Sequence, residues 1–172
     1  IEVEVPAYRI DIMHSYDLIE DVVIAHRYTN IEPELPNVDQ ISDQKTVTAY
    51  TDLLRDTLTG AGAMEAHTYI LSSPEKLFDR MNIEREEIVT MENALTSEYT
   101  AVRNWLTPAL VEVLKRNRHH SYPQKFFEIA DTAHLDESSV GASNRRKLAY
   151  IHADSDADYT DVRGIVQLIG RD

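Results

Sequence analysis

Four carboxylates near the N-terminus have the residue types and the spacing of a metal site. Asp17, Glu20 and Asp21 stand three and four residues apart, so on a helix their side chains share one face of the first turn. Asp11 lies just outside that turn. A helix over residues 15–27 with an opposite, buried face is predicted by apolar residues at helical spacing: Leu18, Ile19, Val22 and Val23.

These acids have two interpretations. Asp17 followed three residues later by Glu20 has the pattern of a capping box, and acids in a first turn interact favourably with the helix dipole. That interpretation does not cover Asp11, because a further carboxylate adds a like charge to a cluster that already repels itself. A hard cation with oxygen ligands removes the conflict, and Mg²⁺ needs only a few carboxylates because it keeps several waters. Both interpretations stay open.

The motifs around these acids resemble those of a known family. Arg9-x-Asp11 followed by Asp17-x-x-Glu20-Asp21 is similar to the end of the small helical domain that precedes the synthetase-like core in archaeal-type beta subunits of phenylalanyl-tRNA synthetase. In that family four acids are assigned to Mg²⁺, so the resemblance implies magnesium ligands at Asp11, Asp17, Glu20 and Asp21. The chain departs from the family at Arg27, which stands where a glycine usually precedes the tyrosine.

The composition is strongly acidic. The 172 residues include 17 basic and 30 acidic side chains, for a formal net charge of −13, and only five of the basic residues are Lys. An acid-rich, lysine-poor surface is typical of halophilic proteins, so we interpret the charge as adaptation to a salty cytoplasm. It argues against a broad nucleic-acid surface, which needs clustered Lys and Arg. The basic run 115–120 ends a predicted helix, where cations suit the dipole.

The sequence lacks the residues that several other kinds of site require. The chain has no Cys, which excludes disulfides, thiol catalysis and zinc-thiolate sites. Its seven His are scattered and form no Ser, His and acid grouping at motif spacing. No apolar run reaches the length of a membrane span. We therefore predict a cytoplasmic protein with no membrane partner, in which no residue is catalytic or binds an organic cofactor.

A proline-containing stretch predicts a division of the chain. Residues 30–43, with Pro33 and Pro36, have the composition of a linker and separate two predicted domains, 1–36 and 37–172. The first domain begins with a predicted strand over residues 1–6. In the second, periodicity and breakers predict helices over 46–58, 74–81, 159–170 and from 107 onward, and strands over 65–71, 88–91, 125–131 and 146–152.

Motifs in the second domain extend the resemblance. The segment from Leu54 to Leu71 is similar to the first conserved motif of class II aminoacyl-tRNA synthetases, which builds a subunit interface. The strand 125–131 is similar to a family motif and lacks the Arg that catalytic class II subunits carry there. Arg103, within a further family motif, has two interpretations. It could clamp a carboxylate or phosphate bidentately, or form a structural ion pair that ties a loop to a helix, which we favour.

The resemblance covers nearly the whole chain and implies an α+β fold. This fold is a class II synthetase-like antiparallel sheet with flanking helices, preceded by the tail of a small helical, winged-helix-like domain. The implied role is the non-catalytic scaffold of the catalytic alpha subunit in an alpha2beta2 heterotetramer that charges tRNA(Phe) with phenylalanine, using ATP. It further implies that these residues belong to a longer chain and are inactive alone. Two alternatives stay open: a winged-helix nucleic-acid-binding module and a free-standing regulatory paralogue.

Overall fold

The protein is described by a computed structural model covering residues 2–37 and 42–170. It divides into two compact units, residues 1–43 and residues 44–172, called here the N-terminal unit and the core unit. In the described parts of the predicted linker, residues 31–37 and 42–43 form no helix or strand, and residues 38–41 lie outside the described residues. Among the described residues, no helix is both long and apolar enough to cross a membrane.

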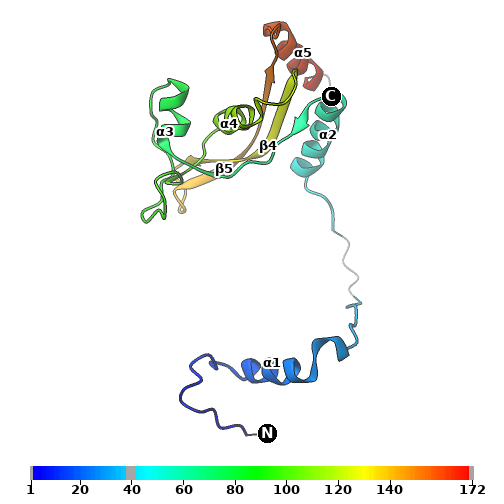
Figure 1. The fold of residues 1–172 in the computed structure, drawn as a ribbon, viewed down its shortest axis with the longest axis vertical. Coiled ribbons are helices and arrows are strands. Elements are labelled where there is room, and N and C mark those ends of the chain that lie inside the picture. The colour runs from blue at the N-terminus through cyan, green and yellow to red at the C-terminus, as the bar shows by residue number, and fades with distance from the viewer. Residues whose placement is uncertain (1, 38–41, 171–172) are drawn as a thin grey trace. The chain divides into compact units, whose positions relative to one another are not determined.

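In the N-terminal unit the predicted helix is confirmed as α1, Ser15–His26, drawn in blue in Figure 1. A 3₁₀ turn, Tyr28–Asn30, follows it. The strand predicted over residues 1–6 is wrong for the described residues 2–6, which lie in no strand. A strand is stable only when it pairs within a sheet, and the described residues of this unit contain no strand that could be its partner.

The apolar face of α1 is open to solvent within this unit. Ile19 is 52% exposed and Val22 is 67% exposed, while Leu18 and Val23 are half-buried. The prediction that this face is buried is therefore wrong for Ile19 and Val22 within the N-terminal unit. The physical reason is that α1 is the only α-helix among residues 2–37, so its apolar stripe has no second element of the unit to pack against.

The core unit alternates helices and strands. Its first helix, α2 (Thr46–Gly60), is followed by Gly62, whose φ of +82° is a left-handed conformation that glycine adopts without strain. The later elements are β1 (Met64–Glu65), β2 (Leu71–Ser72), α3 (Pro74–Leu77), a 3₁₀ turn (Asp79–Met81), β3 (Ala101–Val102), α4 (Thr107–Asn117), β4 (Gln124–Leu135), β5 (Ala142–Ala153) and α5 (Tyr159–Ile169). The predicted strand over 88–91 is reduced to one bridge, between Thr90 and Ala101.

A three-stranded sheet in the order β1-β4-β5 is the frame of this unit. β4 and β5 pair antiparallel over their whole length, from Gln124 opposite Ala153 to Leu135 opposite Ala142, and are the two long neighbouring arrows of Figure 1. β1 pairs with β4 in parallel. The α+β class is confirmed, but the purely antiparallel sheet is wrong at this edge. The long connection through α3 and α4 brings the chain back in the same direction, which parallel pairing requires.

The strand predicted over residues 65–71 is divided into two pieces that join different sheets. β1 pairs with β4, whereas β2 pairs with β3 in a separate two-stranded sheet. Between them the backbone donors find other acceptors. Ala66 donates its N–H to the carbonyl of Phe127, and Thr68 donates its N–H to the Glu128 side chain. The chain therefore leaves the sheet and carries Thr68 to the edge of β4.

β4 is covered on both faces. On one face, Phe127 and Ile129 pack with Leu54 and Leu58 of α2, and partly buried side chains of β5 and α5 complete this cluster: Leu148, Tyr150, Ile165 and Ile169. The alternate positions of β4 are buried too, and one of them is Glu128, only 1% exposed. A carboxylate inside a doubly covered strand is stable only if it is paired and hydrogen-bonded.

Candidate functional site

At the start of α1, Asp17 caps the helix. Its Oδ2 accepts hydrogen bonds from the backbone N–H groups of Met13 at 2.8 Å and His14 at 2.7 Å. His14 is the N-cap residue, and its Nδ1 accepts from the N–H of Tyr16 at 3.2 Å. The capping box therefore joins His14 to Asp17, and not Asp17 to Glu20 as the spacing predicted. The hydrogen bonds from His14 and Met13 hold the pKa of Asp17 below its ordinary value.

Arg9 holds two of the other predicted metal ligands. Its guanidinium donates to the Asp11 carboxylate from Nε at 3.0 and 3.1 Å and from Nη2 at 2.8 Å, and the same Nη2 donates to Asp21 at 2.9 Å. The hydrogen bonds from Arg9 lower the pKa of Asp11, and those to Asp11 and Asp21 raise the pKa of Arg9. The guanidinium of Arg9 thus offsets the repulsion between the carboxylates of Asp11 and Asp21 that their spacing predicted.

The chemistry of this cluster fits Mg²⁺, but its arrangement does not. Four carboxylates stand within residues 11–21, two of them bound to Arg9, and hard oxygens are the ligands that Mg²⁺ prefers. Within residues 2–37 and 42–170, however, no three acidic or His side chains gather closely enough to hold a metal ion. Arg9 binds Asp11 and Asp21, and one oxygen of Asp17 accepts two backbone hydrogen bonds. A metal ion would have to displace Arg9.

In the core unit, Arg103 and Glu128 form a buried ion pair. Nη1 of Arg103 donates to Oε1 of Glu128 at 2.8 Å, and the two side chains are 5% and 1% exposed. Thr68 completes the network, because its Oγ1 accepts from Nη1 of Arg103 at 2.7 Å and donates to Oε2 of Glu128 at 2.6 Å. Nε of Arg103 also donates to the carbonyl of Asp131 at 3.3 Å. The network joins β4 to the segment that leaves the sheet after β1.

These contacts decide between the two interpretations of Arg103. Its side chain lines a groove of about 810 Å³ between α4 and residues 67–72, yet its Nη1 and Nε already donate to Glu128, Thr68 and a β4 carbonyl. The structural ion pair is confirmed, although its partner lies on strand β4 and not on a helix. Sequence reasoning missed Glu128 as that partner. The available signal was a single carboxylate within the apolar run Phe126 to Ile129, which needs a buried cation.

Two family models match the chain, one for each part. The model described as "Phenylalanyl tRNA synthetase beta chain CLM domain" matches residues 31–172. The chain belongs to the phenylalanyl-tRNA synthetase beta-chain family. The model described as "tRNA synthetase B5 domain" matches residues 1–28, so in this beta chain the acidic cluster lies in the B5 match and the Arg103 network in the CLM match.

Curated relatives that match nearly the whole of this chain are named phenylalanine–tRNA ligase beta subunits. Phenylalanine–tRNA ligase beta subunits from Pyrococcus furiosus and Natronomonas pharaonis are 39% and 34% identical to it, over 99% and 98% of its residues. The chain spans about a third of these relatives' length, 31% in both. Among solved structures, a pyrrolysyl tRNA synthetase from Desulfitobacterium hafniense is similar, with a TM-score of 0.56 and 13% identity over 73% of this chain and 44% of that one. This last likeness concerns the fold alone.

The buried ion pair generates a stability prediction. Replacing Arg103 by Met leaves the Glu128 carboxylate buried without its cation, so we expect unfolding in urea to require about 3–5 kcal/mol less free energy. The double variant Arg103→Met with Glu128→Leu removes both charges and should recover most of that loss. Arg85→Met, which breaks an exposed ion pair with Asp79, should change the stability little, because solvent screens exposed ion pairs. A double variant no more stable than Arg103→Met would contradict the ion-pair interpretation.

The cap on α1 generates a pH prediction. Because the pKa of Asp17 is lower in the folded protein than in the unfolded chain, its capping bonds stabilise the helix above the unfolded pKa. That stabilisation is lost as the pH falls through the folded pKa. Asp17→Ala should therefore reduce the helical signal of residues 15–26, measured by NMR at neutral pH, to the level that the unchanged protein reaches in acid. Glu20→Ala is the matched control, and an equal loss in that variant would refute the role of Asp17.

Proposed function

We propose that this chain is a non-catalytic, scaffolding part of the beta subunit of a phenylalanyl-tRNA synthetase. Its role is to support the alpha subunit, which uses ATP to charge tRNA(Phe) with phenylalanine. The observation that carries the proposal is the family match over both parts of the chain. The locked Arg103 supports a structural role for the interior, because the best-placed cation for a carboxylate or phosphate is bound to Glu128. We propose no acid, base or nucleophile among these residues.

The same proposal assigns the domains, compartment and fold. Residues 1–36 are the end of a small helical, winged-helix-like domain, and residues 37–172 are part of a class II synthetase-like, non-catalytic core. The proposed boundary after residue 36 lies between two others. The family matches meet at residues 28–31, and the two compact units divide after residue 43. The protein works in the cytoplasm, and its 30 acidic residues against 17 basic ones suit a halophilic host, in which high salt screens their repulsion.

The proposed partner is the alpha subunit, in an alpha2beta2 heterotetramer. An exposed apolar stripe on α2 supports this proposal: Val47, Tyr50 and Leu53 stand three residues apart and are 57%, 48% and 45% exposed. Residues at this spacing share a helix face, and this face adjoins the buried face of α2 that holds the core residues Leu54 and Leu58. A long apolar stripe that one domain leaves open is typical of a subunit interface. We propose that α2 contacts the alpha subunit through it.

The proposed metal is Mg²⁺, bound by Asp11, Asp17, Glu20 and Asp21 in exchange for Arg9. The cation and the guanidinium compete because both are attracted to the carboxylates of Asp11 and Asp21. What the residues of this chain contribute is oxygen donors on one helix turn and on the segment before it. When bound, the metal would fasten that segment to α1 in place of the present ion pairs.

Assembly with the alpha subunit tests the scaffold. We expect size exclusion with light scattering in molar KCl to show co-elution of the full-length protein and the matching alpha subunit at the mass of two copies of each. Val47→Glu with Leu53→Glu should weaken this assembly because it places charges in the apolar stripe. Val140→Glu with Leu95→Glu, at positions 85% and 100% exposed, should leave it unchanged. Separate elution of two folded proteins would favour the free-standing paralogue instead.

Metal titration tests the exchange with Arg9. Arg9→Gln should bind Mg²⁺ roughly tenfold more tightly than the unchanged protein in calorimetry, because one competing positive charge is removed from the cluster. Arg27→Gln, which removes an exposed cation with no carboxylate partner among the described residues, is the matched control and should change little. Asp11→Asn with Asp21→Asn should abolish binding. Equal affinities of the Arg9→Gln and unchanged proteins would show that the two cations do not share a site.

A further inference from the structure

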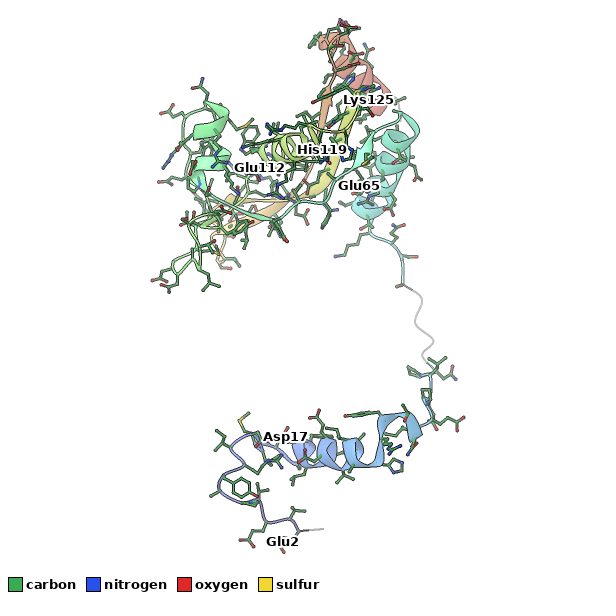
Figure 2. All side chains as sticks on the ribbon, viewed as in Figure 1. Glu2, Asp17, Glu65, Glu112, His119 and Lys125 are labelled. Atoms are coloured by element: carbon green, nitrogen blue, oxygen red, sulfur yellow. The ribbon has the colours of Figure 1, made fainter. Side chains whose placement is uncertain are left out.

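A stretch without carboxylates crosses the end of α4. Residues 113–127 contain no Asp or Glu, although the chain has 30 of them. The same residues hold several basic side chains: Lys115, Arg116, Arg118, His119, His120 and Lys125. Figure 2 labels His119 and Lys125, which lie within this stretch. We call residues 115–122 the basic turn.

In the part of the chain that the structure describes, the cations of the basic turn have no carboxylate within ion-pair distance, and they stand close together in the sequence. Seven other described cations form ion pairs: Arg9, Arg55, Lys76, Arg80, Arg85, Arg103 and Arg146. Six more form none among the described residues: Arg27, Lys45, Lys125, Arg145, Lys147 and Arg163. Lys115, Arg116 and Arg118 are exposed, and none of them forms such a pair within residues 2–37 and 42–170. In so acidic a chain, three neighbouring cations left unpaired are available to an anion from outside.

The helix dipole does not account for this charge. α4 ends at Asn117, so its C-terminal carbonyls lie beside the basic turn. The negative end of a helix dipole is equivalent to about half an elementary charge. Lys115, Arg116 and Arg118 carry three full charges, so most of their charge remains uncompensated.

The backbone of the basic turn is held rigidly. The amide of Asn117 donates to the carbonyl of Val113 at 2.8 Å, and the N–H of His120 donates to the carbonyl of Asn117 at 2.9 Å. The buried side chain of Gln124 donates from Nε2 to the carbonyls of Asn117 at 2.9 Å and His120 at 3.2 Å. A turn fixed in advance loses less conformational entropy when it binds.

We propose that the basic turn contacts the phosphate backbone of RNA. Arg and Lys side chains on a fixed backbone are the usual phosphate contacts, and aromatic rings beside them can stack on bases. The rings of His119 and His120 lie 4.2 Å apart, and Tyr122 is 52% exposed. The turn presents no exposed aliphatic side chain that could anchor an acidic protein partner. The inference rests on the proposed function, which places tRNA(Phe) on the assembly.

The net charge of −13 does not prevent such a contact. The screening length is about 10 Å at 0.1 M salt and about 3 Å at 1 M. In a salty cytoplasm the distant carboxylates are therefore screened from the RNA, while cations in direct contact with phosphates act within the screening length and are weakened rather than abolished by salt. A local stretch without acids can bind RNA where the whole surface cannot.

The test uses the full-length beta subunit assembled with alpha and a tRNA(Phe) transcript. Neutralising Lys115, Arg116 and Arg118 together to Gln should lower the affinity roughly tenfold or more at low salt. It should also make the slope of log affinity against log salt shallower by about 2–3, since each of the three lost phosphate contacts removes about 0.7–0.9 of a unit. The matched control, Arg80→Gln with Arg85→Gln and Arg163→Gln, removes the same formal charge from other exposed positions and should leave the slope unchanged.

The other outcomes separate this inference from the proposed function. An unchanged slope in the triple variant, or equal losses in variant and control, overturns the RNA contact while the scaffold role stands. Loss of co-elution with alpha in the triple variant overturns it as well, because the basic turn then docks on an acidic protein surface. If the unchanged assembly forms but binds no tRNA(Phe), or does not form, the proposed function has failed and the RNA contact with it.

Discussion

The core unit depends on the buried ion pair between Arg103 and Glu128. Two charges removed from water are tolerated only when each is paired and hydrogen-bonded, and here Thr68 and a β4 carbonyl complete the set. Because β4 is covered on both faces, this pairing permits one position for the segment after β1. That segment leaves the sheet, its neighbour β2 joins β3, and a groove opens beside α4. The network thus ties the segment beside the groove to β4.

Charge pairing also organises the surface. Many described cations are bound to carboxylates, as Arg9 is to Asp11 and Asp21. Two exposed groups of charges carry the functional proposals. Three unpaired cations at the end of α4 offer a contact for phosphates. The four carboxylates near Arg9, of which it binds Asp11 and Asp21, retain an excess of negative charge for a metal ion. Both sites are exposed, so salt concentration modulates them far more than it modulates the buried pair.

Apolar surface follows the same logic. The core unit buries one side of α2 against Phe127 and Ile129, but the stripe of Val47, Tyr50 and Leu53 stays exposed. The N-terminal unit buries even less, since Ile19 and Val22 of α1 are more than half exposed. Hydrophobic stabilisation is proportional to the area removed from water. Covering these exposed faces with another surface would therefore add to the stability of both units.

Local patterns in the sequence were sufficient for the elements that depend on nearby residues. The spacing of apolar side chains predicted α1, α2 and α5, because this signal acts within a few turns. The strands predicted over 125–131 and 146–152 cover about half of β4 and of β5, which respectively extend to Leu135 and begin at Ala142. The family motifs predicted membership in the beta-chain family, which the family models confirm. The departure at Arg27 is also a local feature of the sequence. This residue has a φ of 71°, and glycine, which the family usually has here, adopts such a conformation more easily.

Only the tertiary structure decided which distant groups meet. The partner of Arg103 lies 25 residues away and the donor Thr68 lies 60 residues from Glu128, so no local pattern could indicate that the strand over 65–71 divides at this network. Likewise, spacing placed Asp11 and Asp21 in one cluster but could not show that Arg9 binds both. Which acceptor a charged side chain chooses depends on burial and on the groups that reach it through space. The sequence alone determined the helices, the long strands and the family, and long-range pairing of charges determined how they are joined.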